Sequence, residues 1–552
     1  MRCRAMLVAM LAAVVVLGVH VSASEAAGVA ASSRAARADN TIFRLGTTNN
    51  YDSINPFVAF NAQSYTAFTN IYPTLVQYDT SYKLVPDWAT SWTTSKDGLT
   101  WTFKVHTNGK WSDGKPVTTA DAAWTCNLEV KYASTITGNV APFLSHVTRC
   151  DAPDAGTLVI HYGKAVSNVL AQLEQFWVLP QHVWEPQVGA NAKNLKNYDP
   201  GAHLPIVGGG SFFIVKYDKK GTTIMQVNPN YYGPKPKLKA VGVTFFQNSD
   251  AMIAALKGGE IDGVDEVPQT VVASLKRDPK FKVVVGPGEE IRNLGFNSNP
   301  KKPRNRELLD PRVRAAVAHA INRSEIVNVV FRNYAKPAYS LLTSISAPYQ
   351  NTELAPESYD PALANSTLDK LGYKRAAGGV RVAKGHKMSY TIITPSETEG
   401  MNREFAIVKQ DLAKIGIAVT QRSLDSTTAF SEITAPKNQY LSFDMMMWDW
   451  IGYIDPDYIL TVVNCNQYGN RSDTAYCNKA YDKLYAEQGV TIDPAKRKQI
   501  IWQMQKILYR DKPYIQLAQL DLIFAFAKGW NGINPPYLNG LSKIPWEQLQ
   551  KS

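Results

Sequence analysis

Apolar and polar residues alternate with two different periods along the chain, which predicts both strands and amphipathic helices. From 99 to 105, apolar residues occupy every second position after the turn pair Asp97-Gly98, so we expect a half-buried strand there. Asp310-Pro311 predicts the start of a helix, because Asp caps helix N-termini and Pro is tolerated in the first turn. The expected buried stripe of that helix is Val313, Ala316, Val317, Ala320 and Ile321.

Two more helices are predicted in the C-terminal half. One ends before Gly416 and is followed by a strand, and the other is opened by Asp493-Pro494. Strand and helix signals alternate over the whole chain, which predicts an α/β fold. No internal repeat or Pro/Ser-rich linker divides the chain, so we expect lobes between which the backbone crosses more than once. The expected buried stripes are Phe405, Val408, Leu412 and Ile415 in the first helix, and Ile500, Met504, Ile507 and Leu508 in the second.

The N-terminus has the organisation of an export signal. A basic start (1–4) precedes an apolar stretch (5–19), and small residues suited to cleavage follow at 21–23 and 36–38. An uncleaved membrane anchor is the alternative, but the apolar stretch is shorter than the ~20 residues that a spanning helix needs. Cys3 precedes the apolar stretch, so it cannot be the lipid-modified cysteine of a lipoprotein. We therefore expect an exported protein that is not lipid-anchored.

Composition and charge exclude several classes of protein. The 552 residues are 45% hydrophobic and 19% charged, which excludes a disordered chain. The net charge is +12, but the basic residues are spread out, and the densest group (301–306) is broken by Pro and Asn. Nucleic-acid binding needs a basic face with a recognisable module. We expect a solvated basic surface and no nucleic-acid partner.

Four cysteines remain after export, and their number and compartment predict two disulfides. Proximity in sequence suggests Cys126 with Cys150 and Cys465 with Cys477, although four cysteines allow three pairings. A zinc site is the alternative, but no CxxC pair or close histidine pair supports it. The sequence predicts no metal site.

The chain carries none of the common catalytic motifs. It lacks a Gly-x-Ser-x-Gly elbow, a phosphate loop, a dinucleotide fingerprint and a His-Glu-x-x-His pair. Its histidines are scattered without metal-ligand spacing. We predict that the protein is not an enzyme and needs no cofactor, and a secreted hydrolase without a recognised motif stays open as an alternative.

Nine sequence blocks, in register from about Thr41 onward, resemble the extracytoplasmic solute-binding proteins of ABC importers. The resemblance is to the peptide, dipeptide and nickel-binding class, known as family 5. So many blocks in the same order form a specific signal, unlike any one of them alone. The blocks are 52–57 (DSINPF), 84–92 (LVPDWATSW), 97–103 (DGLTWTF), 111–121 (WSDGKPVTTAD), 208–212 (GGGSF), 228–232 (NPNYY), 259–262 (GEID), 312–316 (RVRAA) and 320–323 (AINR).

The resemblance implies a two-lobed periplasmic-binding-protein-like fold of class II, large type. It also implies an extra subdomain on the first lobe and a hinge that the chain crosses twice, near 291–296 and again near 513–517. The ligand is then trapped as the lobes close. The implied limits are 1–38 for the signal and linker, 39–71, 179–290 and 516–552 for lobe I, 72–178 for the extra subdomain, and 291–515 for lobe II.

The resemblance also implies a set of ligand contacts. Peptide binders of this class often carry an Asp shortly after a Trp, and that Asp holds the ligand's α-ammonium. Counting from Trp450, the acid falls at Gly452 or Tyr453, so this chain departs from the pattern. Asp449 is a substitute, or the ligand has no free amine. Asp455 is expected to stabilise the following helix, because Asp-Pro opens helices.

Aromatic and polar residues complete the predicted site. Trp448, Trp450 and Tyr453 are expected in the cleft wall, where a core role is the equal alternative. Asn49, Asn50 and Tyr51 precede a block that faces the cleft in the family. Arg403 is a carboxylate-binding alternative to a solvated charge at a helix start. The segment of Cys465 and Cys477 resembles a cysteine-containing loop of dipeptide binders, which supports their pairing.

The expected function is to bind a solute for an ABC importer. The expected partners are a peptide ligand and a membrane permease with its ATPase, and the protein is expected to be a monomer. An oligosaccharide or another small polar solute is the alternative ligand, and a nickel complex is a third. From other classes, a secreted hydrolase and an envelope chaperone stay open.

Overall fold

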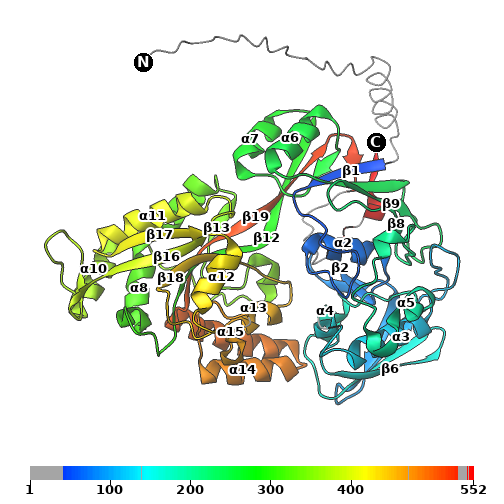
Figure 1. Cartoon of the computed structure of the whole chain (residues 1–552), viewed down its shortest axis with the longest axis horizontal. Helices are drawn as coiled ribbons and strands as arrows, with labels where there is room; N and C mark the ends of the chain where they lie inside the picture. The colour runs from blue at the N-terminus through cyan, green and yellow to red at the C-terminus, as the bar shows by residue number, and fades with distance from the viewer. Residues whose placement is uncertain (1–41, 138–139, 470, 533–543, 545, 552) are drawn as a thin grey trace, which may run out of the picture.

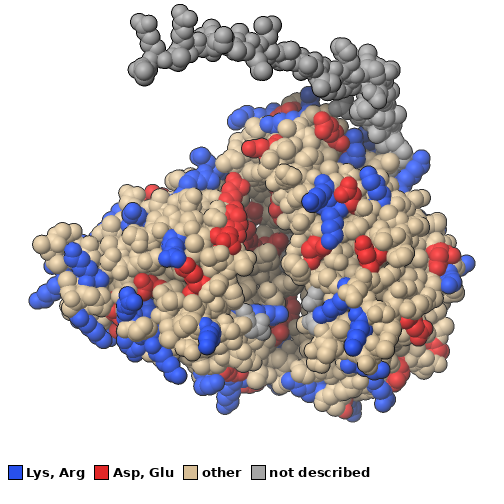
Figure 2. Space-filling view, viewed as in Figure 1, with Lys and Arg blue, Asp and Glu red and all other residues tan. Residues whose placement is uncertain are grey.

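The computed structural model describes residues 42–137, 140–469, 471–532, 544 and 546–551. The predicted export signal lies outside the described residues. Two lobes lie side by side with a deep hollow between them (Figures 1 and 2). In the described part of the chain, no helix is long and apolar enough to cross a membrane.

One mixed sheet passes through both lobes. Its strands run mostly parallel near β16 and β1 and antiparallel elsewhere. Among the described residues it has 11 strands, in the order β17-β16-β18-β12-β19-β11-β1-β10-β9-β8, with β13 paired to β19. Their bounds are β17 Ala418–Leu424, β16 Ser389–Pro395, β18 Met445–Ile451, β12 Phe281–Phe296, β19 Tyr514–Ala527, β11 Gly263–Val264, β1 Ile42–Thr47, β10 Ala240–Phe245, β9 Thr222–Val227, β8 Phe212–Lys216 and β13 Ala335–Pro337.

The two longest strands, β12 and β19, connect the lobes (Figure 1). The first half of β12 (281–287) pairs with 521–527 in lobe I, and its second half (291–295) pairs with 514–519 in lobe II. The register shifts between Pro287 and Ile291, so 288–290 form an irregularity where the chain passes between lobes. Such bulges bend a strand. The hinge therefore consists of two antiparallel strands, each crossing once.

Lobe I carries the extra subdomain. A four-stranded antiparallel sheet, in the order β4-β5-β7-β6, packs against α3 (Thr119–Lys131). The alternation predicted after Asp97-Gly98 is confirmed in β5, because Trp101, Phe103 and Val105 are buried and Lys104 is exposed. The bounds in lobe I are β2 Val76–Tyr78, β3 Leu84–Pro86, β4 Ala89–Thr94, β5 Thr100–Val105, β6 Val147–Asp154, β7 Thr157–Tyr162, β20 Trp530–Asn531, β21 Gln550–Lys551, α2 Ala62–Ile71, α4 Val169–Leu173, α5 Gln181–Val188, α6 Ser249–Gly258 and α7 Gln269–Arg277.

Lobe II confirms the predicted helix starts. The Asp310 carboxylate accepts a hydrogen bond from the backbone N–H of Arg312 (2.8 Å), and Asp493 accepts from those of Ala495 and Lys496. The predicted stripes pack in two apolar clusters that cover the sheet. The bounds are α8 Pro311–Ala320, α9 Arg323–Glu325, α10 Pro361–Lys370, α11 Met401–Lys414, α12 Ser426–Thr434, α13 Asp457–Thr461, α14 Lys479–Val490, α15 Pro494–Asp511, β14 Val382–Ala383 and β15 His386–Lys387.

Both predicted cysteine pairings are confirmed, since the Sγ atoms of each pair lie at bonding distance. Cys126–Cys150 links α3 to β6 inside the extra subdomain. Cys465–Cys477 closes the loop between α13 and α14 in lobe II. These bonds account for all four cysteines of the predicted mature chain, so the zinc alternative falls away.

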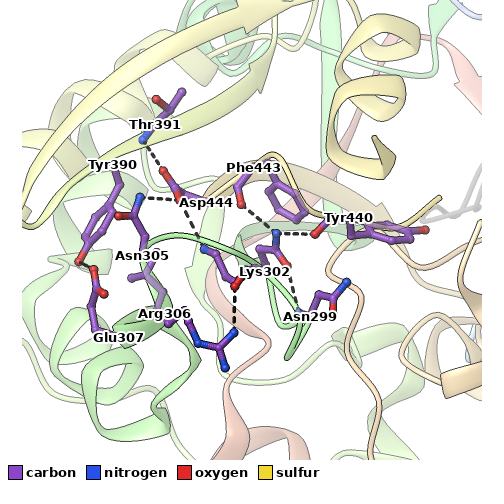
Figure 3. Close-up of polar contacts among 12 residues, drawn as sticks. Asn299, Lys302, Asn305, Arg306, Glu307, Tyr390, Thr391, Tyr440, Phe443 and Asp444 are labelled. Carbon is purple, nitrogen blue, oxygen red and sulfur yellow. Dashed lines mark hydrogen bonds and ion pairs between the residues drawn. The ribbon is translucent and has the colours of Figure 1, made fainter. Parts of the chain in front are cut away.

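One basic residue contradicts the prediction of a solvated basic surface at 301–306. Lys302 is only 2% exposed, and its Nζ lies 3.4 Å from Oδ1 of Asp444 (Figure 3). Asn305 donates to the same oxygen (2.8 Å), and the backbone N–H of Thr391 donates to the other one (3.3 Å). A buried ammonium needs such a partner. Lys302 therefore belongs to the interior of lobe II and not to its solvated surface.

Candidate functional site

The hollow between the lobes is the candidate site. Its end nearest the hinge is a cavity of about 510 Å³ with walls from both lobes and from the hinge itself. Thr48 and Glu266 line it from lobe I, Glu399 and Ile451 from lobe II, and 288–290 from the hinge. Figure 2 shows acidic side chains along the wall of this hollow. A solute bound here contacts both lobes at once.

A second cavity of about 390 Å³ lies between the extra subdomain and lobe II. Its walls include Tyr78 and Tyr82 from one side and Tyr349 and Ile454 from the other. Here the lobes touch, since the backbone N–H of Ser167 donates to the Gly489 carbonyl (3.0 Å). The described conformation therefore already brings the lobes together at the end of the hollow away from the hinge.

Arg292 is the buried cation of the hinge cavity. Its side chain is 6% exposed, and its guanidinium nitrogens lie 2.9 Å from Glu290, 3.8 Å from Glu404 and 3.9 Å from Asp449. Burial raises the pKa of Glu290 to about 7, although the positive charge of Arg292 acts in the opposite direction. Burial likewise raises the pKa of Glu404 to about 7 against the same charge. Three carboxyl groups thus share one guanidinium.

A further pair of carboxyl groups adds to the acidity of this cavity. Burial, together with the negative charges of Glu266 and Glu290, raises the pKa of Glu289 to about 8. Oε1 of Glu266 accepts a hydrogen bond from Nδ2 of Asn49 (2.9 Å). The cavity favours ligand groups that donate hydrogen bonds or carry positive charge.

The predicted aromatic residues Trp448 and Trp450 lie on one face of β18, because successive side chains of a strand point to opposite faces. Both are half-buried against a lobe II cluster. Nε1 of Trp450 donates to Oδ2 of Asp473 (2.9 Å). Burial raises the pKa of Asp473 to about 7, while that hydrogen bond acts to lower it. Asp449, on the opposite face, is paired in register with Arg292.

The loop after β18 brings two other predicted residues to the hollow. The backbone N–H of Gly452 donates to the Glu289 carbonyl (2.8 Å), which ties this loop to the hinge. Tyr453 lies 4.5 Å from Tyr458, measured between ring centroids. Tyr453 also packs in a small apolar cluster that includes Tyr78 of lobe I. The two lobes thus meet through aromatic rings.

The remaining predicted site residues are distributed between the cavity, the surface and the core. Asn49 reaches Glu266 at the hinge cavity, as described, whereas Asn50 is exposed and accepts from Asn61 (2.9 Å). Tyr51 is 3% exposed, and burial raises its pKa to about 12. Arg403 is exposed in the first turn of α11. Ligand contact by any predicted site residue stays a prediction.

Sequence reasoning missed the charged residues of the hinge. Glu289, Glu290 and Arg292 lie within a strand whose later residues are buried. Charges in such a strand need partners or a function, so the run Glu-Glu-Ile-Arg was a usable signal. Glu404 carried no comparable signal, because its burial depends on how α11 packs over the sheet.

Comparisons with known proteins agree with this architecture. The family model for bacterial extracellular solute-binding proteins, family 5 middle, matches residues 83–470. The chain belongs to this family. A Brucella ovis protein, named as a candidate ABC transporter peptide-binding protein, is 30% identical over 421 residues, which are 74% of this chain and 73% of that relative.

Two solved structures show that the fold is shared. Campylobacter jejuni NikZ in complex with Ni(L-His) is 20% identical with a TM-score of 0.77, over 93% of this chain and 100% of that one. The Bacillus subtilis oligopeptide-binding protein AppA, in complex with a nonapeptide, is 20% identical with a TM-score of 0.74, over 93% and 99%. This family 5 protein is the solute-binding component of an ABC importer. Proteins of its family are extracytoplasmic and work with a membrane permease.

Proposed function

We propose that this family 5 protein captures a peptide-like solute between its lobes and delivers it unchanged to the permease. The observation that carries the proposal is the hinge cavity, where the Arg292 guanidinium and the carboxyl groups of Glu289 and Glu290 line one space between both lobes. A peptide has an ammonium, a carboxylate and amide groups, so it can use donors and acceptors of both charges. The names of the Brucella relative and of AppA support the same class.

Closure supplies the mechanism. A ligand that touches both lobes binds the closed form better than the open form, and so shifts the population toward it. The hinge strands β12 and β19 allow this movement at the irregularity near Gly288. No covalent step is needed, and we propose that the protein acts without catalysis or a resident cofactor. We also propose that it is a monomer, released after export without a lipid anchor.

An oligosaccharide is the second candidate ligand. Tyr453 packs against Tyr458 beside the cluster where the lobes meet, and Trp450 precedes them on β18; aromatic faces of this kind stack on sugar rings. In addition, Gly452 and Tyr453 occupy the positions where a peptide binder of this class often has its ammonium-binding acid. The same Trp450 serves either ligand, so only direct binding separates the two.

The test is to purify the exported protein, release any trapped solute and identify it by native mass spectrometry. The melting temperature is then measured with a panel of tri- to pentapeptides and with cellotetraose. We expect peptides to raise it, because a ligand that binds only the folded form stabilises it. A rise with cellotetraose alone would overturn the peptide assignment.

A matched pair of variants tests whether Trp450 contributes to ligand binding. We expect Trp450→Ala to weaken binding of the stabilising peptide and Trp92→Ala to leave it unchanged. Trp92 is also half-buried but lies on β4, against Phe103 of the extra subdomain. Equal affinities of both variants would remove Trp450 from the site.

A further inference from the structure

One segment of lobe I (167–175) faces lobe II directly. Besides the backbone contact of Ser167, Nδ2 of Asn168 donates to Oδ1 of Asp455 across the interface (3.3 Å). Helix α4 follows, and Glu174 lies at its C-terminal end. Glu174 therefore lies at the end of a segment that contacts lobe II.

Glu174 has a carboxyl oxygen without a hydrogen-bond donor. The residue is 2% exposed, and its Oε2 accepts from Nε2 of Gln175 (2.7 Å). Its Oε1 is buried and has no hydrogen-bond partner among the described residues. Nor does any described Lys, Arg or His form an ion pair with Glu174. Native proteins rarely leave such an acceptor unsatisfied without a reason.

The residues just before Glu174 line the second cavity, since Val169, Leu170 and Ala171 form part of its wall opposite Tyr349 and Ile454 of lobe II. Burial is the main cause that raises the pKa of Tyr453, which belongs to lobe II, and of Tyr78, which packs with Tyr453 in the cluster between the lobes; the negative charge of Glu174 adds a smaller effect in the same direction. Burial raises the pKa of Glu174 itself to about 8, and the charge of Asp87 adds to that effect. A positive charge arriving between the lobes would reverse this shift.

A second buried carboxyl group shows that burial alone does not create this arrangement. Glu129, on α3, is 3% exposed, and burial is the one cause that raises its pKa. No charged or phenolic group of lobe II acts on it. Glu174 differs because it directly follows helix α4, whose residues line the cavity between the extra subdomain and lobe II.

We propose that Glu174 is a ligand subsite, in which Oε1 accepts a hydrogen bond from an ammonium group of the solute. This inference rests on the proposed function and assigns to lobe I a determinant of ligand charge. Closure excludes water from the subsite, which strengthens a charge-assisted hydrogen bond. The Glu174 subsite also explains how the chain can bind an amine although its loop after Trp450 has no acid at Gly452 or Tyr453.

The experiment measures, by isothermal titration, the binding of tri- to pentapeptides in free and N-acetylated form. Wild type, Glu174→Gln and the control Glu129→Gln are compared. We expect Glu174→Gln to weaken binding of the free peptides by about 10- to 100-fold, the worth of a charge-assisted hydrogen bond. Acetylation should cause a similar loss in wild type and Glu129→Gln but little further loss in Glu174→Gln.

The outcomes separate this inference from the proposed function. If peptides bind wild type but neither acetylation nor Glu174→Gln changes the affinity, the subsite is overturned and the peptide function stands. If no peptide binds wild type, the proposed function fails and the subsite with it. Glu174→Asp retains the charge and should recover part of the binding, and acetylation in wild type tests the subsite without any variant.

Discussion

Asp455 and Arg497 form a two-point ion pair in lobe II, with Nη1 2.6 Å from Oδ2 and Nη2 2.9 Å from Oδ1. Oδ1 of Asp455 also accepts the backbone N–H of Asp457 (3.0 Å), which agrees with the predicted role at the start of α13. Across the interface, Asn168 of lobe I donates to the same oxygen. One carboxylate thus supports a helix, a buried arginine and a contact between the lobes.

Removing this carboxylate is expected to destabilise the protein strongly. The Arg497 side chain is 3% exposed, so Asp455→Ala leaves a buried charge without its partner, at a cost of about 3 kcal/mol or more. Urea denaturation measures the loss. Glu353→Ala is the control, because its ion pair with Lys506 is more than half exposed on both sides and contributes less than ~1 kcal/mol. Equal losses would contradict the buried role of Asp455.

Stability is expected to fall as the pH rises from 5 to 8. Burial raises the pKa of Glu174 and Glu289 to about 8 in the folded protein, well above that of an unfolded Glu. The folded state then holds more protons than the unfolded state in this range, so the free energy of unfolding decreases with pH. The stabilisation is complete below about pH 4.5 and is lost as the pH approaches 8.

The variant Glu174→Gln isolates one of these groups. It lacks the titrating carboxyl, so we expect its stability relative to wild type to be higher at pH 8 than at pH 5, by on the order of 1 kcal/mol or more. Urea denaturation at both pH values measures the difference. The exposed Glu487→Gln on α14 serves as control and should show no such change. A difference of opposite sign would contradict the burial of Glu174.

A side chain at Gly288, in the hinge, is expected to lower the stability of the protein. A Cβ atom at this position would lie 2.6 Å from the Leu520 carbonyl oxygen, which is shorter than the contacts that real Cβ atoms make. Because this oxygen belongs to the backbone, it cannot turn away as the end of a flexible side chain can. We expect Gly288→Ala to cost about 1–3 kcal/mol, as overpacking does, and to alter closure as seen by small-angle scattering. Gly258→Ala is the control, because its Cβ would make only an ordinary contact of 3.8 Å with a Glu260 side-chain oxygen and Ala suits the end of helix α6. A neutral Gly288→Ala would show that the strands can separate there.

The two disulfides are expected to differ in their effect on binding. Opening Cys465–Cys477 by Ser substitution should cost about 2–4 kcal/mol and also weaken ligand binding, because its loop holds Asp473, the partner of Trp450. Opening Cys126–Cys150 should lower stability without changing affinity at 20 °C, since that bond joins α3 to β6 and neither cysteine lines either cavity between the lobes. Denaturation and calorimetry measure the two effects. A similar loss of affinity in both variants would contradict this division.

Local patterns predicted the elements well but the site only in part. The caps at Asp310 and Asp493, the alternation in β5 and both cysteine pairings depend on residues close in sequence, and all are confirmed. The sequence blocks identified the family, which the family model confirms. The predicted limits of the lobes and of the extra subdomain stay predictions.

Lys302 and Arg292 show where local patterns were insufficient. Lys302 lies in a polar, basic stretch, yet it is buried because Asp444, far along the chain, compensates its charge. Arg292 gains its role from Glu404 and Asp449, which reach it only when α11 and β18 pack beside β12. Partners so distant in sequence leave no periodic signal.

Residues near one another in the chain therefore established the secondary structure, the disulfides and the family of this protein, because capping, alternation and short loops act over a few positions. The packing of two lobes decided which carboxyl groups lose water and which face each other across the hollow. Asn168 and Asp455 illustrate this, since they are separated by 287 residues and their side chains form a hydrogen bond across the interface. Desolvation and long-range charge interactions depend on three-dimensional distance, which the order of residues does not express locally.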